Sequence, residues 1–262
     1  MERDGVTGRD EDTGRAGGPP PREVSLARAD MTSLRPAPPE AVAAALSEVA
    51  ELGPFFSVGA GEHGGMWRSV EEAYADGFAQ LVSAFATRHG LSERRVAVSV
   101  VQLGHAARLW SPVLGCVVTH GIVPDLGGLR QRVDGSALWL PEARGWWAPR
   151  GQGLARVMYR LVMEEHLAVL ARGLRIKVAS GLLHGNAASA LAGAAHAVVR
   201  ARPGLRRPVT SLAGALLDIG DLRGTGAFTG PDLVFRRRSC CLYYRLPDGG
   251  ICGDCCLIGK RS

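Results

Sequence analysis

The sequence predicts an α+β fold with a predominantly α-helical core, a small β-hairpin and a C-terminal cysteine-rich segment. Three observations support this fold class. Most long apolar segments repeat at three- and four-residue spacing, the period of an amphipathic helix. An Asp-Gly pair between two short apolar runs is typical of a hairpin turn. Five of the six cysteines lie within the last 23 residues.

The composition favours one folded domain with a short appendage. The chain has 262 residues and 46% hydrophobic content, so it can bury a core without depending on a metal. Residues 1–37 are rich in glycine, proline and charged side chains and predict a disordered polar tail. We expect a mainly helical domain over residues 38–232 and a cysteine-rich segment over residues 233–262.

Two amphipathic helices are expected early in this domain, over residues 40–52 and 69–88, with a loop between them. In the second helix, apolar residues recur every three or four positions and form a single stripe. Ser69 followed by Glu72 predicts a capping box at its start, and Gly90 predicts its end.

A denser apolar segment over residues 92–109 predicts a buried helix. Pro112 is expected to break or kink it before a second apolar piece, residues 113–120, because proline lacks the amide hydrogen that a helix interior needs. The Asp134-Gly135 pair that follows predicts the turn of the hairpin.

The remaining elements are helices and short strands near the cysteines. Three helices are expected over residues 154–173, 176–202 and 208–219. The second of these is expected to be interrupted at His184-Gly185. Short strands over residues 233–235 and 242–244 are expected to flank the cysteine region.

The cysteines have the spacing of a metal-binding site. Cys240 and Cys241 are followed, after ten residues, by Cys252 and Cys255 in a CxxC motif. The intervening segment contains proline, aspartate and glycine, which favour a reversal of the chain. Such a reversal can gather four thiolates around one centre.

Two kinds of metal centre are compatible with this spacing. Structural zinc sites take cysteines in pairs separated by a few residues, which suits the CxxC half but not two adjacent cysteines on one tetrahedral ion. A [2Fe–2S] cluster is larger, so adjacent cysteines could reach different corners of it. The chemistry alone leaves both open. Disulfides are less favoured, because the chain lacks a secretory signal.

The residues around the cysteines resemble a known family. Residues 237–245, RRSCCLYYR, and residues 250–255, GICGDC, resemble the C-terminal signature of the FhuF-like ferric-siderophore reductases. Residues 108–112 and 184–191 are also similar to members of this family. The resemblance implies a [2Fe–2S] cluster held by Cys240, Cys241, Cys252 and Cys255.

This resemblance implies an oxidoreductase that acts on metal ions. Such a protein would reduce chelated Fe(III) to Fe(II) by one electron and release iron from a ferric siderophore of hydroxamate type. No GxxxxGK[ST] motif occurs. The electron is expected to come from another protein, a ferredoxin or a flavin/NAD(P)H reductase. Two alternatives stay open: an iron–sulfur redox sensor and a zinc-stapled binding module, both without turnover.

Two cysteines lie outside the expected ligand set. Cys256 directly follows Cys255 and could compete with it, but the family pattern needs only Cys255. Cys116 lies alone in an apolar stretch and predicts a small buried hydrophobe.

Positive charge is concentrated around the cysteines. Residues 200–262 carry 11 Lys and Arg against 5 Asp, whereas the rest of the chain is balanced. Four arginines flank the expected ligands: Arg236, Arg237, Arg238 and Arg245. They could dock an acidic donor or an anionic ferric complex, or stabilise a reduced cluster. The basic residues are few and no helix-turn-helix or finger pattern occurs, so no nucleic-acid partner is expected.

The expected location is the cytoplasm, including the inner face of the cell membrane. No apolar run approaches the roughly 18 residues of a membrane span, and the start lacks the apolar region of a secretory signal. His105 and His184 lie in apolar helical segments and are expected to be core histidines. Asn186 is expected to cap a helix or to line a pocket beside the cluster, with a structural role the better supported.

Overall fold

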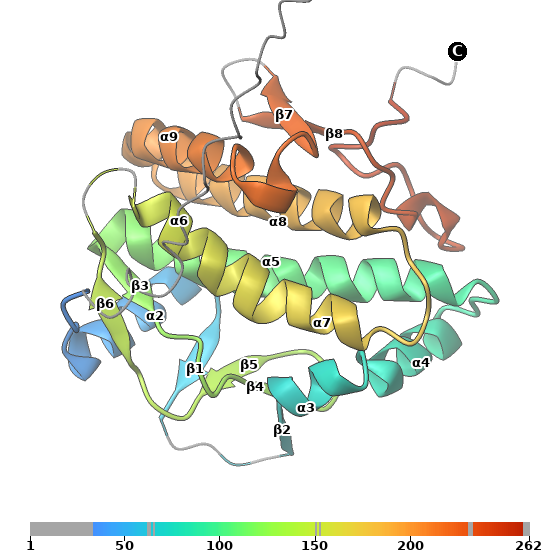
Figure 1. Ribbon diagram of the computed structural model, residues 1–262, viewed down its shortest axis with the longest axis horizontal. Helices are drawn as coiled ribbons and strands as arrows, with labels where there is room; N and C mark the ends of the chain where they lie inside the picture. Colours follow the sequence, from blue (N-terminus) through green and yellow to red (C-terminus); the bar gives the residue numbers. More distant parts are fainter. Residues whose placement is uncertain are drawn as a thin grey trace, which may run out of the picture.

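The computed structural model describes residues 34–61, 64, 66–149, 151, 153–229 and 233–258. It confirms the α+β fold with a mainly helical core (Figure 1). The predicted polar tail lies outside the described residues except for residues 34–37. In this short piece Ala37 is buried, and its N–H donates to the carbonyl of Gly145 at 3.0 Å.

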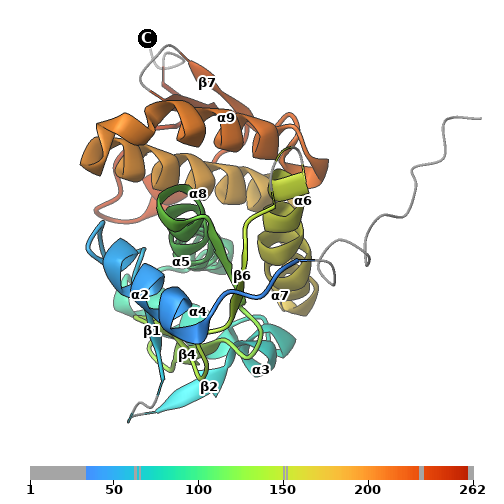
Figure 2. The ribbon, with the colours of Figure 1, turned by 90° about the vertical axis from the view of Figure 1, so that its left-hand side faces the viewer.

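Two long helices form the centre of the fold. α5 (Arg94–His120) and α8 (Ser180–Ala201) pack against each other and lie side by side in both views (Figures 1 and 2). α2 (Pro39–Ala50) and α4 (Ala79–Arg88) pack on other parts of α5, and α9 (Arg206–Leu217) packs on α8. Sixteen residues of α5 are buried as a result, so this helix forms the middle of the hydrophobic core.

Short strands form three small sheets within the described residues. The four-stranded sheet has the order β1 (Val58–Ala60), β5 (Leu138–Leu140), β4 (Arg130–Arg132), β2 (Trp67–Ser69). The other sheets pair β3 (Ile122–Pro124) with β6 (Gly145–Trp147), and β7 (Gly226–Thr229) with β8 (Val234–Arg237). The predicted Asp134-Gly135 hairpin is confirmed as the turn between β4 and β5, where Gly135 has a φ of 72°.

The helix predicted over residues 154–173 is confirmed, but its middle is not α-helical. It consists of α6 (Gly153–Tyr159), a π-helical segment η1 (Arg160–Leu167) and α7 (Ala168–Gly173). π-Helical turns are rare, and the apolar spacing of the sequence does not distinguish them from an α-helix.

The prediction of a single helix over residues 69–88 is wrong. The chain forms α3 (Val70–Ala75), turns at Gly77 and Phe78, and continues as α4. Both turn residues have left-handed φ values, 62° and 58°. A Cβ on Gly77 would overlap the backbone of Gly173 at the end of α7. The helix is therefore divided where α7 packs against it.

The start of α3 also differs from the predicted capping box. The Oγ of Ser69 does cap the helix, but it accepts from the N–H of Glu71 at 3.2 Å rather than from that of Glu72. Gly90 ends α4 as predicted, with a φ of 59°.

Two predicted interruptions do not occur. α5 continues through Pro112, although a proline inside a helix costs about 3 kcal/mol. Ser111, Pro112 and Val113 are all buried, so packing around this turn offsets the cost. α8 continues through His184 and Gly185. Local helix-breaking signals are overridden at both places by tertiary contacts.

The other predicted helices are confirmed with small shifts of their ends, as α2, α8 and α9. Cys116 is completely buried in α5, as predicted, and burial raises the pKa of its thiol to about 12. No helix in the described part of the chain combines the length and the apolar character needed to cross a membrane.

Replacing Gly77 by alanine is expected to destabilise the fold by about 2 kcal/mol or more. A Cβ disfavours the left-handed backbone by roughly 1–2 kcal/mol and would also overlap Gly173. Gly181→Ala is the matched control, because a Cβ there meets no atom within 4 Å and should stabilise α8 by roughly 0.5–1 kcal/mol. Denaturant unfolding measures both; equal stabilities of the two variants would contradict the account of the turn.

Candidate metal centre

The first cysteine loop follows β8 and carries Cys240 and Cys241. It ends in a 3-10 turn, η4 (Tyr243–Arg245), where the sequence predicts a strand. That prediction is wrong, because Leu242 has a left-handed φ of 63° that turns the chain out of an extended conformation. The loop is therefore compact and keeps both cysteines near the end of β8.

The second cysteine loop folds back on the first. The N–H of Cys255 donates to the carbonyl of Cys252 at 3.0 Å and closes the CxxC turn. The N–H of Arg237, at the end of β8, donates to the carbonyl of Asp254 at 3.1 Å. The Sγ atoms of Cys241 and Cys252 are 3.4 Å apart. One sulfur from each half of the motif is thus in direct contact.

The other two sulfurs of the motif receive backbone hydrogen bonds. The N–H of Leu242 lies 3.4 Å from the Sγ of Cys240, and the N–H of Leu257 lies 3.3 Å from the Sγ of Cys255. Cys241 and Cys255 are buried, whereas the remaining two are partly exposed. Hydrogen bonds to ligand sulfurs are one of the means by which a protein sets the reduction potential of an iron–sulfur centre.

Contact between the two loops makes their thiols unequal. A hydrogen bond from the Cys252 thiol lowers the pKa of Cys241 to about 6, and the N–H of Tyr243 and the positive charge of Arg237 act in the same direction. The same contact, together with burial, raises the pKa of Cys252. The contact therefore favours the thiolate form of Cys241, the form that binds metals.

Cys256 lies within electrostatic range of the sulfurs of Cys240 and Cys255. Burial raises the pKa of its thiol, and the charges of Cys240 and Cys255 raise it further. Across the described ranges, no three His, Cys, Asp or Glu side chains are gathered as ligands of one metal ion. The four sulfurs expected around one centre therefore make separate contacts and do not together form a ligand set for one metal ion.

A buried hydrogen-bond network joins the first cysteine loop to both central helices. Ser99 of α5 donates its hydroxyl to the carbonyl of Cys241 at 2.6 Å. Asn186 of α8 donates to the Ser99 carbonyl at 3.0 Å and to Gln102 Oε1 at 2.9 Å. Its Oδ1 accepts from Arg237 Nη2 at 2.7 Å. Asn186 is therefore neither a helix cap nor a pocket residue but the centre of this network.

Gly185 lets the cysteine segment approach α8. A Cβ at this position would overlap the Oγ of Ser239 and lie 3.1 Å from Arg237 Nη2. The Ser239 hydroxyl is itself buried and makes no hydrogen bond within the described residues. The helix and the segment before the cysteines are therefore in van der Waals contact, with no room for a larger residue.

Arg237 is buried, with only 2% of its surface exposed. Its Nη2 bonds to Asn186, but its Nε and Nη1 have no partner and no carboxylate pairs with it among the described residues. The docking role expected for Arg237 is incompatible with this burial, because a bound partner could not reach the side chain. A guanidinium stays charged in proteins, so burial of these two donors without acceptors is costly.

The other three flanking arginines are more accessible. Arg238 and Arg245 are exposed and Arg236 is partly buried. Arg245 also forms an ion pair with Glu93, which precedes α5, and so ties the first cysteine loop to that helix. Their roles in docking stay predictions.

A cavity of about 380 Å³ lies beside the second cysteine loop, between α8 and β8. It is lined by Ser189, Ala192, Gly193, His196, Leu233, Val234, Phe235, Gly253 and Asp254. The Ser189 hydroxyl donates to the Asp254 carboxylate. Because Gly253 and Asp254 separate Cys252 from Cys255, this cavity adjoins the candidate metal centre.

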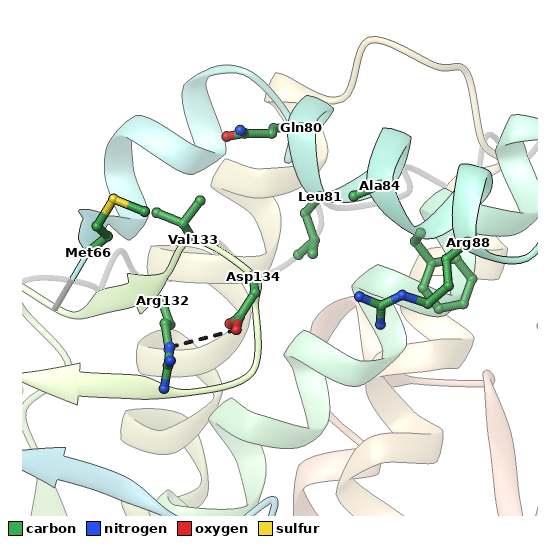
Figure 3. Close-up of a pocket in the computed structure, with 9 residues that line it drawn as sticks. Met66, Gln80, Leu81, Ala84, Arg88, Arg132, Val133 and Asp134 are labelled. Carbon is green, nitrogen blue, oxygen red and sulfur yellow. Dashed lines mark ion pairs between the residues drawn. The ribbon is translucent and has the colours of Figure 1, made fainter.

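A second cavity, of about 570 Å³, lies between α4 and the β4–β5 turn (Figure 3). Leu81 and Ala84 from α4 and Val133 from the turn give it apolar walls, and Arg132 Nε lies 3.6 Å from Asp134 Oδ2 at its edge. None of the cysteines lines this cavity.

The prediction of a core histidine is confirmed for His105. Its Nε2 lies 2.6 Å from the Tyr74 hydroxyl, which is 3.0 Å from His166 Nδ1, and all three side chains are buried. Burial lowers the pKa of His105 to about 3 and that of His166 to about 4, so both are neutral at neutral pH. His184 is instead partly exposed, 3.8 Å from Asp221, so that prediction is wrong.

Comparison with known proteins identifies the cysteine segment. Residues 237–257 match a family model described as the FhuF 2Fe-2S C-terminal domain. The match spans both cysteine loops and confirms the resemblance and the [2Fe–2S] cofactor that it implied. No curated protein matches the chain. The helical body lies outside the matched residues.

The residues present suit such a cluster. A cluster bound by thiolates is anionic, and the charge of Arg237 acts on both Cys241 and Cys256, so this guanidinium is within electrostatic reach of the site. Its two unpaired donors are what an added anion would satisfy. Cys240, Cys241, Cys252 and Cys255 could hold the cluster.

Gly185→Ala is expected to weaken cluster retention about tenfold, because the new Cβ pushes the cysteine segment away from α8. Ser239→Ala alone should be neutral, since it removes a buried hydroxyl that has no partner. The double variant should regain much of the wild-type retention, because the overlapping Oγ is gone. Iron and acid-labile sulfide per chain measure all three. Failure of the second change to rescue the first would refute this contact.

Proposed function

We propose that this protein is a ferric-siderophore reductase, an oxidoreductase that transfers one electron to chelated Fe(III) and releases Fe(II). The observation that carries the proposal is the match of residues 237–257 to a FhuF 2Fe-2S domain. In the structure this segment places the thiols of Cys241 and Cys252 in contact. Cys240, Cys241, Cys252 and Cys255 are the proposed ligands.

The bound cluster supplies a one-electron carrier, which suits the one-electron difference between ferric and ferrous iron. Hard oxygen donors such as hydroxamates hold Fe(III) much more tightly than Fe(II), because the ferric ion has the higher charge. Transfer of one electron to the chelate therefore releases the metal and leaves the chelator intact. The proposed substrate is a ferric siderophore of hydroxamate type.

The protein itself positions the ligands and excludes water from one side of them. Ser99 and Asn186 hold the first cysteine loop on α5 and α8, and burial of Cys241 and Cys255 keeps solvent from two of the sulfurs. The 380 Å³ cavity adjoins the residues between Cys252 and Cys255, so it is the proposed binding place of the chelate.

The proposed electron donor is an acidic redox protein, a ferredoxin or a flavin/NAD(P)H reductase. The exposed guanidinium group of Arg238 gives the segment a basic surface that would favour an acidic partner, whereas that of Arg245 is paired with Glu93. The proposed location is the cytoplasm, including the inner face of the membrane, where an imported chelate would arrive. Nucleic acid is not a proposed partner.

Cys241→Ser is expected to lose the cluster, and the loss should exceed the roughly 10–100-fold effect of outer-shell changes on metal affinity. Cys256→Ser is the matched control and should retain the cluster, because Cys256 is outside the proposed ligand set. Iron, zinc and acid-labile sulfide per chain, with the visible absorption spectrum, measure the outcome. A colourless wild-type protein with one zinc ion would instead support a zinc-stapled module.

Gly193→Leu tests the chelate site. Gly193 lines the 380 Å³ cavity and a Cβ there meets no atom within 4 Å, so the larger side chain enters the cavity without straining α8. We expect kcat/KM for a ferric hydroxamate to fall about tenfold or more, with cluster content unchanged. Gly214→Leu in α9 is the control, since it also has open space and lies outside the cavity.

Reoxidation of the reduced wild-type protein by the ferric chelate separates a reductase from a redox sensor. The chelate should reoxidise it faster than a control oxidant of similar potential does, with one Fe(II) formed per electron delivered. Equal rates for the two oxidants would favour a sensor without turnover. Equal kcat/KM in Gly193→Leu and Gly214→Leu would remove the cavity from the proposal but not the reductase activity.

A further inference from the structure

Arg237 is a buried charge that has no counter-ion in the part of the chain that the structure describes. Among the described residues its guanidinium has one hydrogen-bond partner, the amide oxygen of Asn186, while Nε and Nη1 have none. Its neighbours in the sequence differ from it, because Arg236 on β8 is only partly buried and Arg238, which directly follows β8, is exposed. A charged group in the protein interior is costly unless an opposite charge is near.

The position of this guanidinium is fixed from several sides. Asn186 cannot turn freely, because its Nδ2 is bonded to the Ser99 carbonyl and to Gln102 Oε1. The backbone N–H of Arg237 is held by the carbonyl of Asp254 in the second cysteine loop. The charge therefore stays in one place when its surroundings change.

The acidic groups around Arg237 do not neutralise it. The Asp254 carboxylate accepts from Ser189 and makes no ion pair with the guanidinium within the described residues. The backbone N–H of Arg237 bonds to the carbonyl of Asp254, between Cys252 and Cys255. Its side-chain partner Asn186 bonds to Ser99, whose hydroxyl bonds to the carbonyl of Cys241. The anion that this guanidinium can balance is therefore one formed at the cysteines.

We infer that Arg237 is the interior counter-cation of the iron–sulfur cluster, held in position by Asn186, and that it raises the reduction potential of the cluster. The inference rests on the cysteine ligands of the proposed function but not on the identity of the electron acceptor. Reduction adds one negative charge at the site, and a fixed guanidinium stabilises the more negative state. Arg237 is a positioning residue that acts on the cluster through its charge.

A second consequence concerns the protein without its cluster. In that state the guanidinium is desolvated and unbalanced, so it disfavours the folded apo-protein. With the cluster bound, the same charge is compensated and favours the folded state. A neutral residue at this position should therefore have opposite effects on the two forms. A residue that only packs or only bonds Asn186 would weaken both forms alike.

The test uses Arg237→Gln, with Arg237→Lys to restore the charge and Arg238→Gln as the exposed control at the next position in the sequence. All are reconstituted with iron and sulfide, and the cluster potential is measured by redox titration followed by its visible spectrum. In Arg237→Gln the ratio of reduced to oxidised cluster at a fixed potential should fall at least tenfold, which for one electron is about 59 mV. The Lys variant and the Arg238 control should stay within about threefold of wild type.

Thermal unfolding of the apo and holo forms completes the test. Apo Arg237→Gln should unfold at the same temperature as wild type or higher, and the holo form at a lower temperature. If Arg237→Gln retains no cluster while its apo form is as stable as wild type, the inference is supported. The cluster potential is then measured in Arg237→Lys. An unchanged potential in a fully loaded Arg237→Gln protein, or equal destabilisation of both forms, would overturn it.

These readouts are independent of the proposed activity. If the wild-type protein reduces no ferric chelate but the potentials and stabilities change as described, the reductase proposal fails and the role of Arg237 stands. If the protein reduces ferric chelates but the cluster potential does not depend on Arg237, the role of Arg237 fails and the reductase proposal stands.

Discussion

The hydrogen bonds of Asn186 are the interaction on which the site depends. One amide side chain, fully buried in α8, bonds to the backbone of α5, to Gln102 and to Arg237. Through Ser99 the same network reaches the carbonyl of Cys241. Because every member is buried, breaking one bond leaves unpaired polar atoms in the core. The network therefore links the loops that carry the cysteines to the two central helices, α5 and α8.

Small residues make this link geometrically possible. Gly185 admits Ser239 and Arg237 to the surface of α8, and Ala187 and Ala188 that follow are completely buried. Similar close approach occurs on the far side of the molecule, where Gly77 and Gly173 let α7 pass next to the turn between α3 and α4. In both places the chain contains glycine because a second backbone or a polar side chain occupies the space of a Cβ.

The prediction errors have a common cause. Pro112 lies inside an unbroken helix, and the interruption expected at Gly185 is absent, because both residues are surrounded by packed neighbours that compensate for a weak local propensity. The division at Gly77 is the opposite case. There, a segment with good helical periodicity is interrupted by contact with α7. Short-range signals describe what a segment favours alone, and these three segments do not lie alone.

The sequence by itself determined the class of fold, most helices, the hairpin and the cysteine motif of the metal centre. These follow from spacing along the chain, because an amphipathic period, an Asp-Gly turn and a CC-x10-CxxC motif are all local properties. The choice of a [2Fe–2S] cluster over zinc came from the resemblance to a known family and not from the spacing. Only the tertiary structure decided that Arg237 is buried while Arg238 is exposed, and that Ser99, Gln102 and Asn186 converge on the cysteine loop. The hydrogen-bonded partners in that network are between 51 and 142 residues apart in the sequence. Burial and long-range hydrogen bonding depend on how helices pack in three dimensions, and no pattern within one segment encodes that packing.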